Sequence, residues 1–191
     1  MKIVAINGSP RKEGNTAKML HGITKDHAGI DLKYFDLAEM KLADCKACMH
    51  CKTHDGCSIK DDMTKLYKAI NEADAVVLGT PLYMSSETAT TKAFEDRLYA
   101  YLAYGEQRGT FMSKVPTGKK AMIVITCGNP KGAEIYKSTA DRFLQLFALL
   151  GFKPVLVEVQ GGVMPTSDVM EMPGAQAICE KGRKMLSGEC D

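Results

Sequence analysis

The chain has 191 residues, of which 45% are hydrophobic, and its 25 Lys and Arg nearly balance its 23 Asp and Glu. A net charge of +2 gives no basis for nucleic-acid binding, which normally appears as a basic patch. The chain has no apolar run near the ~20 residues that a membrane helix needs. We therefore expect a cytoplasmic protein without nucleic-acid or membrane partners, folded as a single domain over residues 1–191.

Short apolar runs alternate with helical patterns along the chain. The runs, which are typical of buried strands, cover residues 2–7, 30–35, 75–80, 120–126 and 153–159. Helices are expected at residues 16–25, 61–72, 86–104 and 132–150 and from Pro173 onward, with Asp61 and Ser86 as N-caps. Residues 44–58, 105–118 and 161–174 are expected to be loops. The alternation predicts an α/β fold, a doubly wound five-stranded parallel sheet with helices on both faces.

A glycine-bounded loop from Gly8 to Thr16 joins the first expected strand to the first helix. The free N–H groups and the dipole of a helix N-terminus attract anions, and Ser9, Asn15 and Thr16 add side-chain donors. Gly8 and Gly14 permit a ligand to approach the backbone closely. The loop is no P-loop, because five residues separate its glycines and Asn15 replaces the lysine, and the dinucleotide fingerprint is absent as well. One terminal phosphate is the expected ligand, and an ordinary strand-to-helix connection is the alternative.

Four of the seven cysteines lie close together, at Cys45, Cys48, Cys51 and Cys57. Three thiolates at successive three-residue steps can wrap one compact cluster, as in the first part of the bacterial ferredoxin run. Cys57 follows after five residues and is free to close the same cluster. Structural zinc sites more often use two separated cysteine pairs. The spacing favours a [4Fe–4S] cluster over the alternatives, a zinc site or a metal-free thiol–disulfide switch.

The third expected strand runs into the sequence TPLYM, from Thr80 to Met84. This loop leaves the sheet at its carboxyl edge, where open α/β sheets bind ligands. Tyr83 offers an aromatic face and Met84 a polarizable thioether to a planar ring. The alternative is that both side chains only pack the loop.

In combination, these segments resemble the flavodoxin-like NADPH-dependent FMN reductase superfamily. The matching segments are GSPRKEGNT from Gly8 to Thr16, Asp61-Asp62-Met63, Ala73-Asp74, TPLYM from Thr80 to Met84, and Lys92 with Asp96-Arg97. The compact cysteine run resembles that of the iron–sulfur flavoproteins, a branch of the same superfamily. The resemblance implies a flavodoxin-like fold with FMN at the sheet edge.

The resemblance also implies which residues bind the cofactors. They are Ser9, Arg11, Asn15 and Thr16 for the ribityl phosphate, Pro81, Leu82, Tyr83 and Met84 for the ring, Thr126, Cys127 and Gly128 for a third loop that completes the pocket, and Cys45, Cys48, Cys51 and Cys57 for the cluster. The sequence predicts no catalytic acid, base or nucleophile.

Flavins exchange one or two electrons, whereas an iron–sulfur cluster passes one at a time. We therefore predict an FMN-containing electron-transfer oxidoreductase with a [4Fe–4S] cluster, which passes electrons between ferredoxin-like carriers and small acceptors such as quinones or oxygen species. One alternative is an NAD(P)H-dependent FMN or quinone reductase without a cluster. A second alternative is a thiol or metal redox sensor.

Two further expectations concern the arrangement of the sites. If the first two strands are neighbours, the phosphate loop and the cysteine loop leave one edge of the sheet, and cluster and flavin lie close within one chain or across a subunit contact. The expected helix at residues 86–104 has more apolar side chains than one sheet face needs, among them Phe94, Leu98, Tyr101 and Leu102. Together with the insert at 105–118, this predicts a homo-oligomer, either a dimer or a tetramer.

Overall fold

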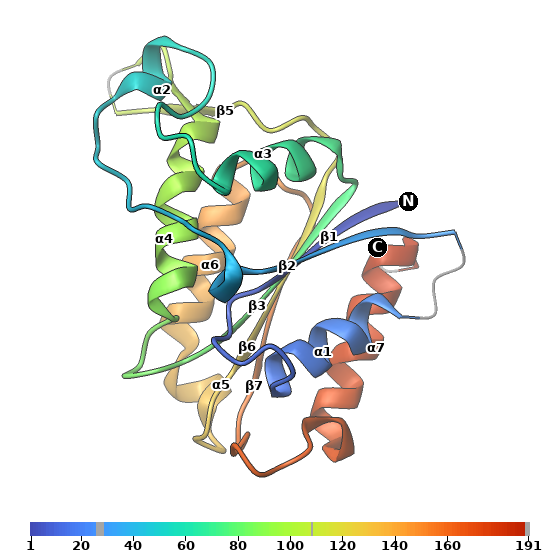
Figure 1. Cartoon of the computed structure of the whole chain (residues 1–191). Helices are drawn as coiled ribbons and strands as arrows, with labels where there is room; N and C mark the ends of the chain where they lie inside the picture. The colour runs from blue at the N-terminus through green and yellow to red at the C-terminus, as the bar shows by residue number, and fades with distance from the viewer. Residues whose placement is uncertain (26–28, 108, 190–191) are drawn as a thin grey trace.

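The structure is a computed structural model of the chain and describes residues 1–25, 29–107 and 109–189. Its centre is a five-stranded parallel sheet in the order β2-β1-β3-β6-β7 (Figure 1). The strands are β1 (Lys2–Asn7), β2 (Asp31–Asp36), β3 (Ala75–Pro81), β6 (Lys120–Thr126) and β7 (Val155–Gln160). This is the flavodoxin-like strand order, and it confirms the predicted fold class.

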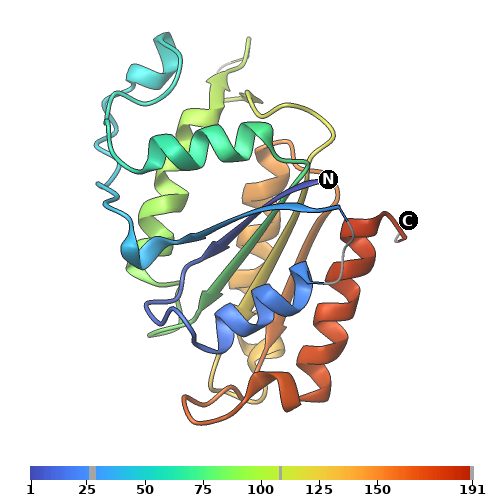
Figure 2. The same ribbon diagram turned by 45° about the vertical axis from the view of Figure 1, so that its right-hand side comes forward.

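Helices cover both faces of the sheet (Figures 1 and 2). They are α1 (Asn15–Thr24) and α7 (Pro173–Ser187) on one face, and α3 (Met63–Glu72), α4 (Ala89–Arg97) and α6 (Lys137–Leu149) on the other. Successive strand residues point to opposite faces, so Ile3 packs in the core beneath α1 and α7 and Val4 in the core beneath α3, α4 and α6. All seven residues of β3 are buried because both faces of this central strand are covered.

The helix predicted over residues 86–104 is shorter than expected. The side chain of Thr88, not Ser86, caps α4 by accepting a hydrogen bond from the Thr91 N–H (3.2 Å). Ser86 is unavailable as a cap because its backbone closes a tight turn with Tyr83. The helix ends at Arg97 and continues as the 3-10 turn η2 (Leu98–Tyr101).

A β-hairpin follows this turn, where the sequence predicted the end of a helix and a loop. Strand β4 (Leu102–Tyr104) pairs antiparallel with β5 (Phe111–Ser113), and Arg108 between them lies outside the described residues. The Lys52 ammonium donates to the carbonyls of Tyr99 and Leu102 (2.6 and 2.5 Å). Lys52 thereby anchors the end of η2 and the start of β4.

Smaller differences occur elsewhere. The helix predicted over residues 132–150 is two helices, α5 (Gly132–Ile135) and α6, which are separated by Tyr136 (φ −102°, ψ 23°). The remaining short elements are η1 (Leu37–Glu39), α2 (His50–Thr53) within the predicted cysteine loop, and η3 (Val169–Glu171) within the predicted loop at 161–174. Across the described part of the chain, every helix is too short or too polar to cross a membrane.

Candidate functional site

The loop between β1 and α1 is shaped by hydrogen bonds to its own residues. Asn7, buried at the end of β1, accepts from the Ser9 backbone N–H (3.1 Å) and donates to the Asp36 carboxylate at the end of β2 (2.7 Å). The Ser9 hydroxyl oxygen accepts from the Arg11 N–H (3.1 Å). The loop is therefore preformed in front of α1, and the Ser9 hydroxyl keeps its hydrogen for a ligand.

The glycines of this loop serve internal packing. A Cβ at Gly8 would lie 2.0 Å from Thr91 Oγ1, and a Cβ at Gly14 would lie 2.9 Å from the Arg11 Cβ. The hydroxyls of Thr88 and Thr91 donate to the Gly8 carbonyl (2.6 and 3.4 Å). Gly8 thus fastens the loop to the first turn of α4, whereas the sequence suggested that this glycine makes room for a ligand.

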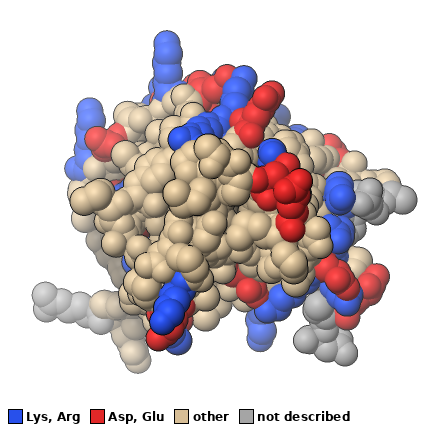
Figure 3. Space-filling view, turned by 90° about the horizontal axis from the view of Figure 1, so that it is seen from below, with Lys and Arg blue, Asp and Glu red and all other residues tan. Residues whose placement is uncertain are grey.

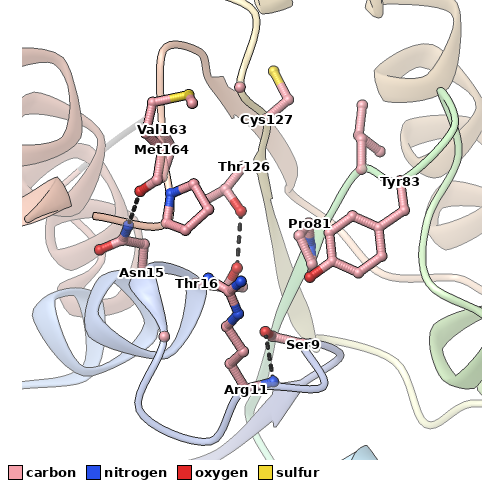
Figure 4. Close-up of a pocket in the computed structure, with 14 residues that line it drawn as sticks. Ser9, Arg11, Asn15, Thr16, Pro81, Tyr83, Thr126, Cys127, Val163 and Met164 are labelled. Carbon is pink, nitrogen blue, oxygen red and sulfur yellow. Dashed lines mark hydrogen bonds between the residues drawn. The ribbon is translucent and has the colours of Figure 1, made fainter. Parts of the chain in front are cut away.

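A cleft opens at the carboxyl ends of the parallel strands (Figure 4). It is lined by Ser9, Arg11, Gly14, Asn15, Thr16, Pro81, Leu82, Tyr83, Thr126, Cys127, Gly128, Val163, Met164 and Pro165. Uncharged side chains occupy the middle of this end of the molecule, and charged ones lie mainly towards its margin (Figure 3). The structure thus brings together every predicted flavin residue except Met84, and their contact with FMN stays a prediction.

Met84 does not belong to the cleft, because it lies at the tip of a tight turn. Met84 and Ser85 both adopt positive φ (48° and 66°), and Tyr83 and Ser86 exchange two backbone hydrogen bonds across them (2.8 and 3.1 Å). Left-handed backbone is uncommon for residues other than glycine and often marks functional loops. The Met84 side chain is 99% exposed, whereas Tyr83 stands at the rim of the cleft.

Thr16 and Asn15 hold the walls of the cleft together. The buried Thr16 hydroxyl shares a hydrogen bond with the Thr126 hydroxyl (2.8 Å), which joins the start of α1 to the end of β6. The Asn15 amide donates to the Met164 carbonyl (3.0 Å) and accepts from the Val169 N–H (3.2 Å). Because both polar atoms of the Asn15 amide are used, this residue positions the 164–169 segment.

That segment supplies a fourth wall, which the sequence did not predict. Val163, Met164 and Pro165 line the cleft. Besides Asn15, an ion pair between Lys18 and Asp168 (2.9 Å) holds the segment against α1. The sequence contained one indication of this wall: the segment follows the last expected strand, and loops at the carboxyl ends of parallel strands form ligand sites.

Cys127 contributes its side chain to the end of the cleft above β6. Burial raises the pKa of the Cys127 thiol, which donates a weak hydrogen bond to the Asn129 carbonyl (3.7 Å). A Cβ at Gly132 would lie 2.2 Å from the Cys127 sulfur. Cys127 is therefore a neutral, closely packed residue of the cleft wall.

A second cavity is lined by all four clustered cysteines. Its lining is Cys45, Lys46, Ala47, Cys48, Met49, Cys51, Cys57, Ser58, Ile59, Asp96, Arg97, Tyr99 and Ala100. Positive φ at Ala47 and Met49 (48° and 60°) coils the backbone around it. Hydrogen bonds from the Ser58 hydroxyl (3.4 Å) and the His50 N–H hold the pKa of Cys48 below its ordinary value.

The donor set of this cavity suits soft metals, because thiolates select iron–sulfur clusters, zinc or copper(I). Among the described residues, however, no group of three or more His, Cys, Asp or Glu side chains has its atoms arranged to hold a metal ion. The four thiols thus share one cavity without converging on a single point. We name this feature the cysteine cradle, meaning residues 45–58 together with the end of α4.

A buried ion pair, Arg97 with Asp61, is the clasp that holds together the segments that flank residues 45–58, at one end of the cysteine cradle. The fully buried Arg97 guanidinium donates to both carboxylate oxygens of Asp61 (2.7 and 3.0 Å) and to the Ala43 carbonyl (2.8 Å). Asp61 also accepts from the N–H groups of Ala43 and Met63 (2.9 and 3.1 Å). Burial would raise the pKa of Asp61, but these hydrogen bonds outweigh burial and lower it. The sequence offered Asp61 as a helix N-cap and a family match, and Arg97 only as a family match. In the structure Asp62, not Asp61, holds the N-cap position of α3, and the fold pairs Asp61 with Arg97.

The opposite end of the cradle rests on η2 and the β-hairpin. The Lys52 ammonium lies 3.3 Å above the Tyr99 ring, in addition to its two carbonyl contacts. The Lys114 ammonium donates to the Cys51 carbonyl (2.9 Å). Protein contacts therefore hold the cradle at both ends.

The cleft and the cradle lie at opposite ends of α4 (Figures 1 and 2). Thr88, just before the helix, binds Gly8 of the phosphate loop, and Arg97, its last residue, lines the cradle. Nine helical residues span roughly 14 Å. Both loops leave the same sheet edge, as expected, because β1 and β2 are parallel neighbours. The expectation that the two sites lie close together is wrong within a single chain, because the segment after β2 turns back along α4 to its clasp at Arg97.

Comparisons with known proteins agree with this arrangement. The family model described as NADPH-dependent FMN reductase matches residues 1–170. Two proteins named iron–sulfur flavoprotein from Archaeoglobus fulgidus are 34% identical over 167 residues (86% of this chain and 70% of the relative) and 36% identical over 161 residues (80% and 74%). Both matches cover most of each chain.

Solved structures show the same fold at low sequence identity. An NAD(P)H:quinone oxidoreductase from Methanothermobacter marburgensis superposes with a TM-score of 0.76 and 20% identity, covering 97% of this chain and 98% of that one. The matching family model and the iron–sulfur flavoprotein relatives show that the protein is a flavin-dependent oxidoreductase, and the family model supports FMN as its flavin. It belongs to the iron–sulfur flavoprotein branch of the NADPH-dependent FMN reductase family.

Proposed function

We propose that this protein is an electron-transfer oxidoreductase that binds FMN in the cleft and a [4Fe–4S] cluster on Cys45, Cys48, Cys51 and Cys57. It passes electrons between a ferredoxin-like carrier and small-molecule acceptors such as quinones. The observation that carries the proposal is that all four cysteines line one cavity held at both ends by protein contacts. The names of the relatives from Archaeoglobus fulgidus support it.

The cleft suits a phosphate at one end and a planar ring at the other. The Ser9 hydroxyl, the Arg11 side chain and the first N–H groups of α1 bind the phosphate, since a helix N-terminus favours an anion. Asn15 contributes indirectly, because its side-chain amide donates a hydrogen bond to the Met164 carbonyl and so positions that wall of the cleft. The ring contacts Pro81, Leu82 and Tyr83 on one side of the cleft. A further wall, formed by Val163, Met164 and Pro165, excludes water from the ring.

Bound FMN supplies one- and two-electron chemistry, and a bound cluster supplies one-electron exchange. The residues of this chain orient the two groups and control the surroundings. The Thr16–Thr126 hydrogen bond keeps the start of α1 against the end of β6, and both residues line the cleft. Burial keeps the Cys127 thiol protonated beside the cleft, so it adds no negative charge there.

We propose further that the two sites cooperate across a subunit contact in a homo-oligomer, a dimer or a tetramer. The separation of the sites along α4 supports this. The apolar side chains that the sequence analysis offered as evidence do not, because Phe94, Leu98, Tyr101 and Leu102 are buried within their own chain. The support comes instead from the hairpin, where Tyr104, Phe111 and Met112 are exposed large hydrophobic side chains.

Anaerobic purification followed by flavin, iron and sulfide analysis tests the proposal. We expect one FMN, four iron and four sulfide per chain and a broad visible shoulder beside the flavin bands. Flavin without iron would favour an NAD(P)H-dependent FMN or quinone reductase, the second candidate, which the description of the family model supports. A colourless protein would contradict both proposals and favour a thiol or metal sensor.

A further inference from the structure

Arg97 has one hydrogen-bond donor that the protein leaves without a partner. Its two terminal nitrogens bind Asp61, the Ala43 carbonyl and, at 3.4 Å, the Ile59 carbonyl. Its Nε is buried and has no hydrogen-bond partner among the residues that the structure describes. Buried donors are nearly always paired, so an orphan N–H of a charged group calls for an explanation.

The position of Arg97 indicates where the missing partner lies. Of the three buried, unpartnered side-chain atoms in the described residues, those of Tyr34, Glu95 and Arg97, only Arg97 belongs to the lining of the cysteine cradle. Cys57 and Arg97 both line this cavity. A guanidinium with an unused N–H therefore borders a cavity of four thiols.

We propose that Arg97 Nε–H donates a hydrogen bond to a sulfur atom of the cluster in the cradle, either the Cys57 thiolate or an inorganic sulfide, and thereby raises the reduction potential of the cluster. This inference rests on the proposed cluster. A reduced cluster carries one more negative charge than an oxidised one, so a donor and a positive charge beside its sulfur atoms stabilise the reduced form. One electron is added and no bond is made or broken, while Arg97 stays protonated.

Asp61 provides a matched control because its carboxylate carries the opposite charge and binds the same guanidinium. Arg97→Lys keeps a cation that can reach Asp61 but removes Nε, so we expect a lower potential. Asp61→Asn keeps Nε and removes a nearby negative charge, so we expect a higher potential. A purely structural role for the pair would move both potentials in the same direction, since both variants weaken the same clasp.

The first experiment is an anaerobic dithionite titration of the wild type and both variants, followed by electron paramagnetic resonance of the reduced cluster. We expect the equilibrium constant for reduction to fall about tenfold in Arg97→Lys, which is about 59 mV for a one-electron couple. The Asp61→Asn constant should rise. Unchanged potentials, or shifts of one sign in both variants, would overturn the inference.

The second experiment uses the wild type, so its outcome does not depend on whether a variant folds. Wild-type protein labelled with 15N at arginine Nε is reduced, and pulsed electron paramagnetic resonance is used to detect 15N coupling to the cluster. We expect a coupling that is absent from unlabelled protein. If the wild type contains the cluster but shows no such coupling, the proposed role of Arg97 is overturned and the proposed cluster is not. The Arg97 Nε then binds something else, such as a water. A wild type without iron and sulfide overturns the proposed cluster as well.

Discussion

At the start of α4 the protein builds its cleft from backbone and hydroxyl groups, whereas at the end of the same helix it builds the cysteine cradle around a buried charge. Gly8, Thr88 and Thr91 meet through neutral hydrogen bonds at the first end. Arg97 and Asp61 meet as ions at the second. The cleft forms at the regular edge of the sheet, whereas the cradle is an irregular segment held by a buried ion pair.

The cleft and the cysteine cradle, the two proposed cofactor sites, are also separate in space. The cleft and the cradle share no lining residue. Substitutions at one end should therefore leave the other cofactor bound, since distant sites in a protein are usually independent.

The largest expected effect is loss of iron from the cradle. Alanine at Cys45, Cys48, Cys51 or Cys57 removes one of four ligands, so iron and sulfide should fall to a small fraction of the wild-type content while FMN remains bound. Cys179→Ala is the control, because Cys179 is buried elsewhere, beside Met19. Full iron and sulfide in all four cradle variants would show that the ligand assignment is wrong.

The matching test at the cleft is loss of FMN. Thr16→Glu should expel FMN, because a carboxylate at the start of α1 repels the phosphate. Thr16→Val is milder: it leaves the Thr126 hydroxyl without its partner, at a cost of about 1–3 kcal/mol, and should weaken FMN binding by about 5- to 150-fold. Equilibrium dialysis measures both.

Thr64→Glu serves as the control for the added charge, since Thr64 is exposed in the first turn of α3. This variant should bind FMN normally. Normal FMN retention by Thr16→Glu would instead contradict the assignment of the phosphate to the start of α1.

Electron donors provide the next test. A one-electron donor such as reduced ferredoxin should reduce the flavin quickly in the wild type and slowly in Cys57→Ala, whereas NADPH should be a slow donor to both. Anaerobic stopped-flow absorbance follows the reaction. Fast reduction by NADPH that is unaffected by the substitution would favour the reductase without a cluster.

The clasp should matter for stability, as judged by urea unfolding. Arg97→Met leaves Asp61 as an unpaired, largely buried charge, so we expect a loss of about 3–5 kcal/mol in the free energy of unfolding. Lys92→Met breaks an exposed pair with Asp96 on the same helix and should cost only about 0–1 kcal/mol. Equal losses in the two variants would contradict a special role of the clasp.

The pH dependence of the clasp follows from the lowered pKa of Asp61. A carboxylate whose folded pKa is lowered stabilises the fold above its ordinary value of 3.8, and this contribution disappears as the pH falls through the folded pKa. The stability difference between wild type and Asp61→Asn should therefore be constant at neutral pH and shrink below about pH 4. A difference that shrinks on raising the pH from neutrality would contradict this assignment.

The smallest expected effect concerns assembly. We expect light scattering at high protein concentration to report a dimer or tetramer, with Phe111→Ser shifted towards monomer because Phe111 is exposed and stacks on Tyr104. Ile135→Ser, an exposed position on α5, should not shift it. A single monomeric species of the wild type would rule out the oligomer.

Local patterns determined much of this protein. The alternation of apolar runs and helical stripes predicted the five parallel strands to within two residues, because burial on both faces leaves a period that is visible in the sequence. The phosphate loop and the cysteine spacing could be recognised as motifs because each lies in one short segment, and their binding of FMN and a cluster stays a prediction. The loop glycines were recognised as well, although the contact that requires Gly8 is with Thr91, 83 residues away.

Only the tertiary structure decided how these segments meet. It ended α4 at Arg97, paired Arg97 with Asp61, placed Met164 against Asn15 and turned the cysteine segment back along α4. Each of these outcomes depends on contacts between residues 36 to 149 positions apart in the chain. Such contacts leave no period or spacing in the sequence, because a buried ion pair or an amide–carbonyl contact needs its partners close in space, not at any set distance along the chain.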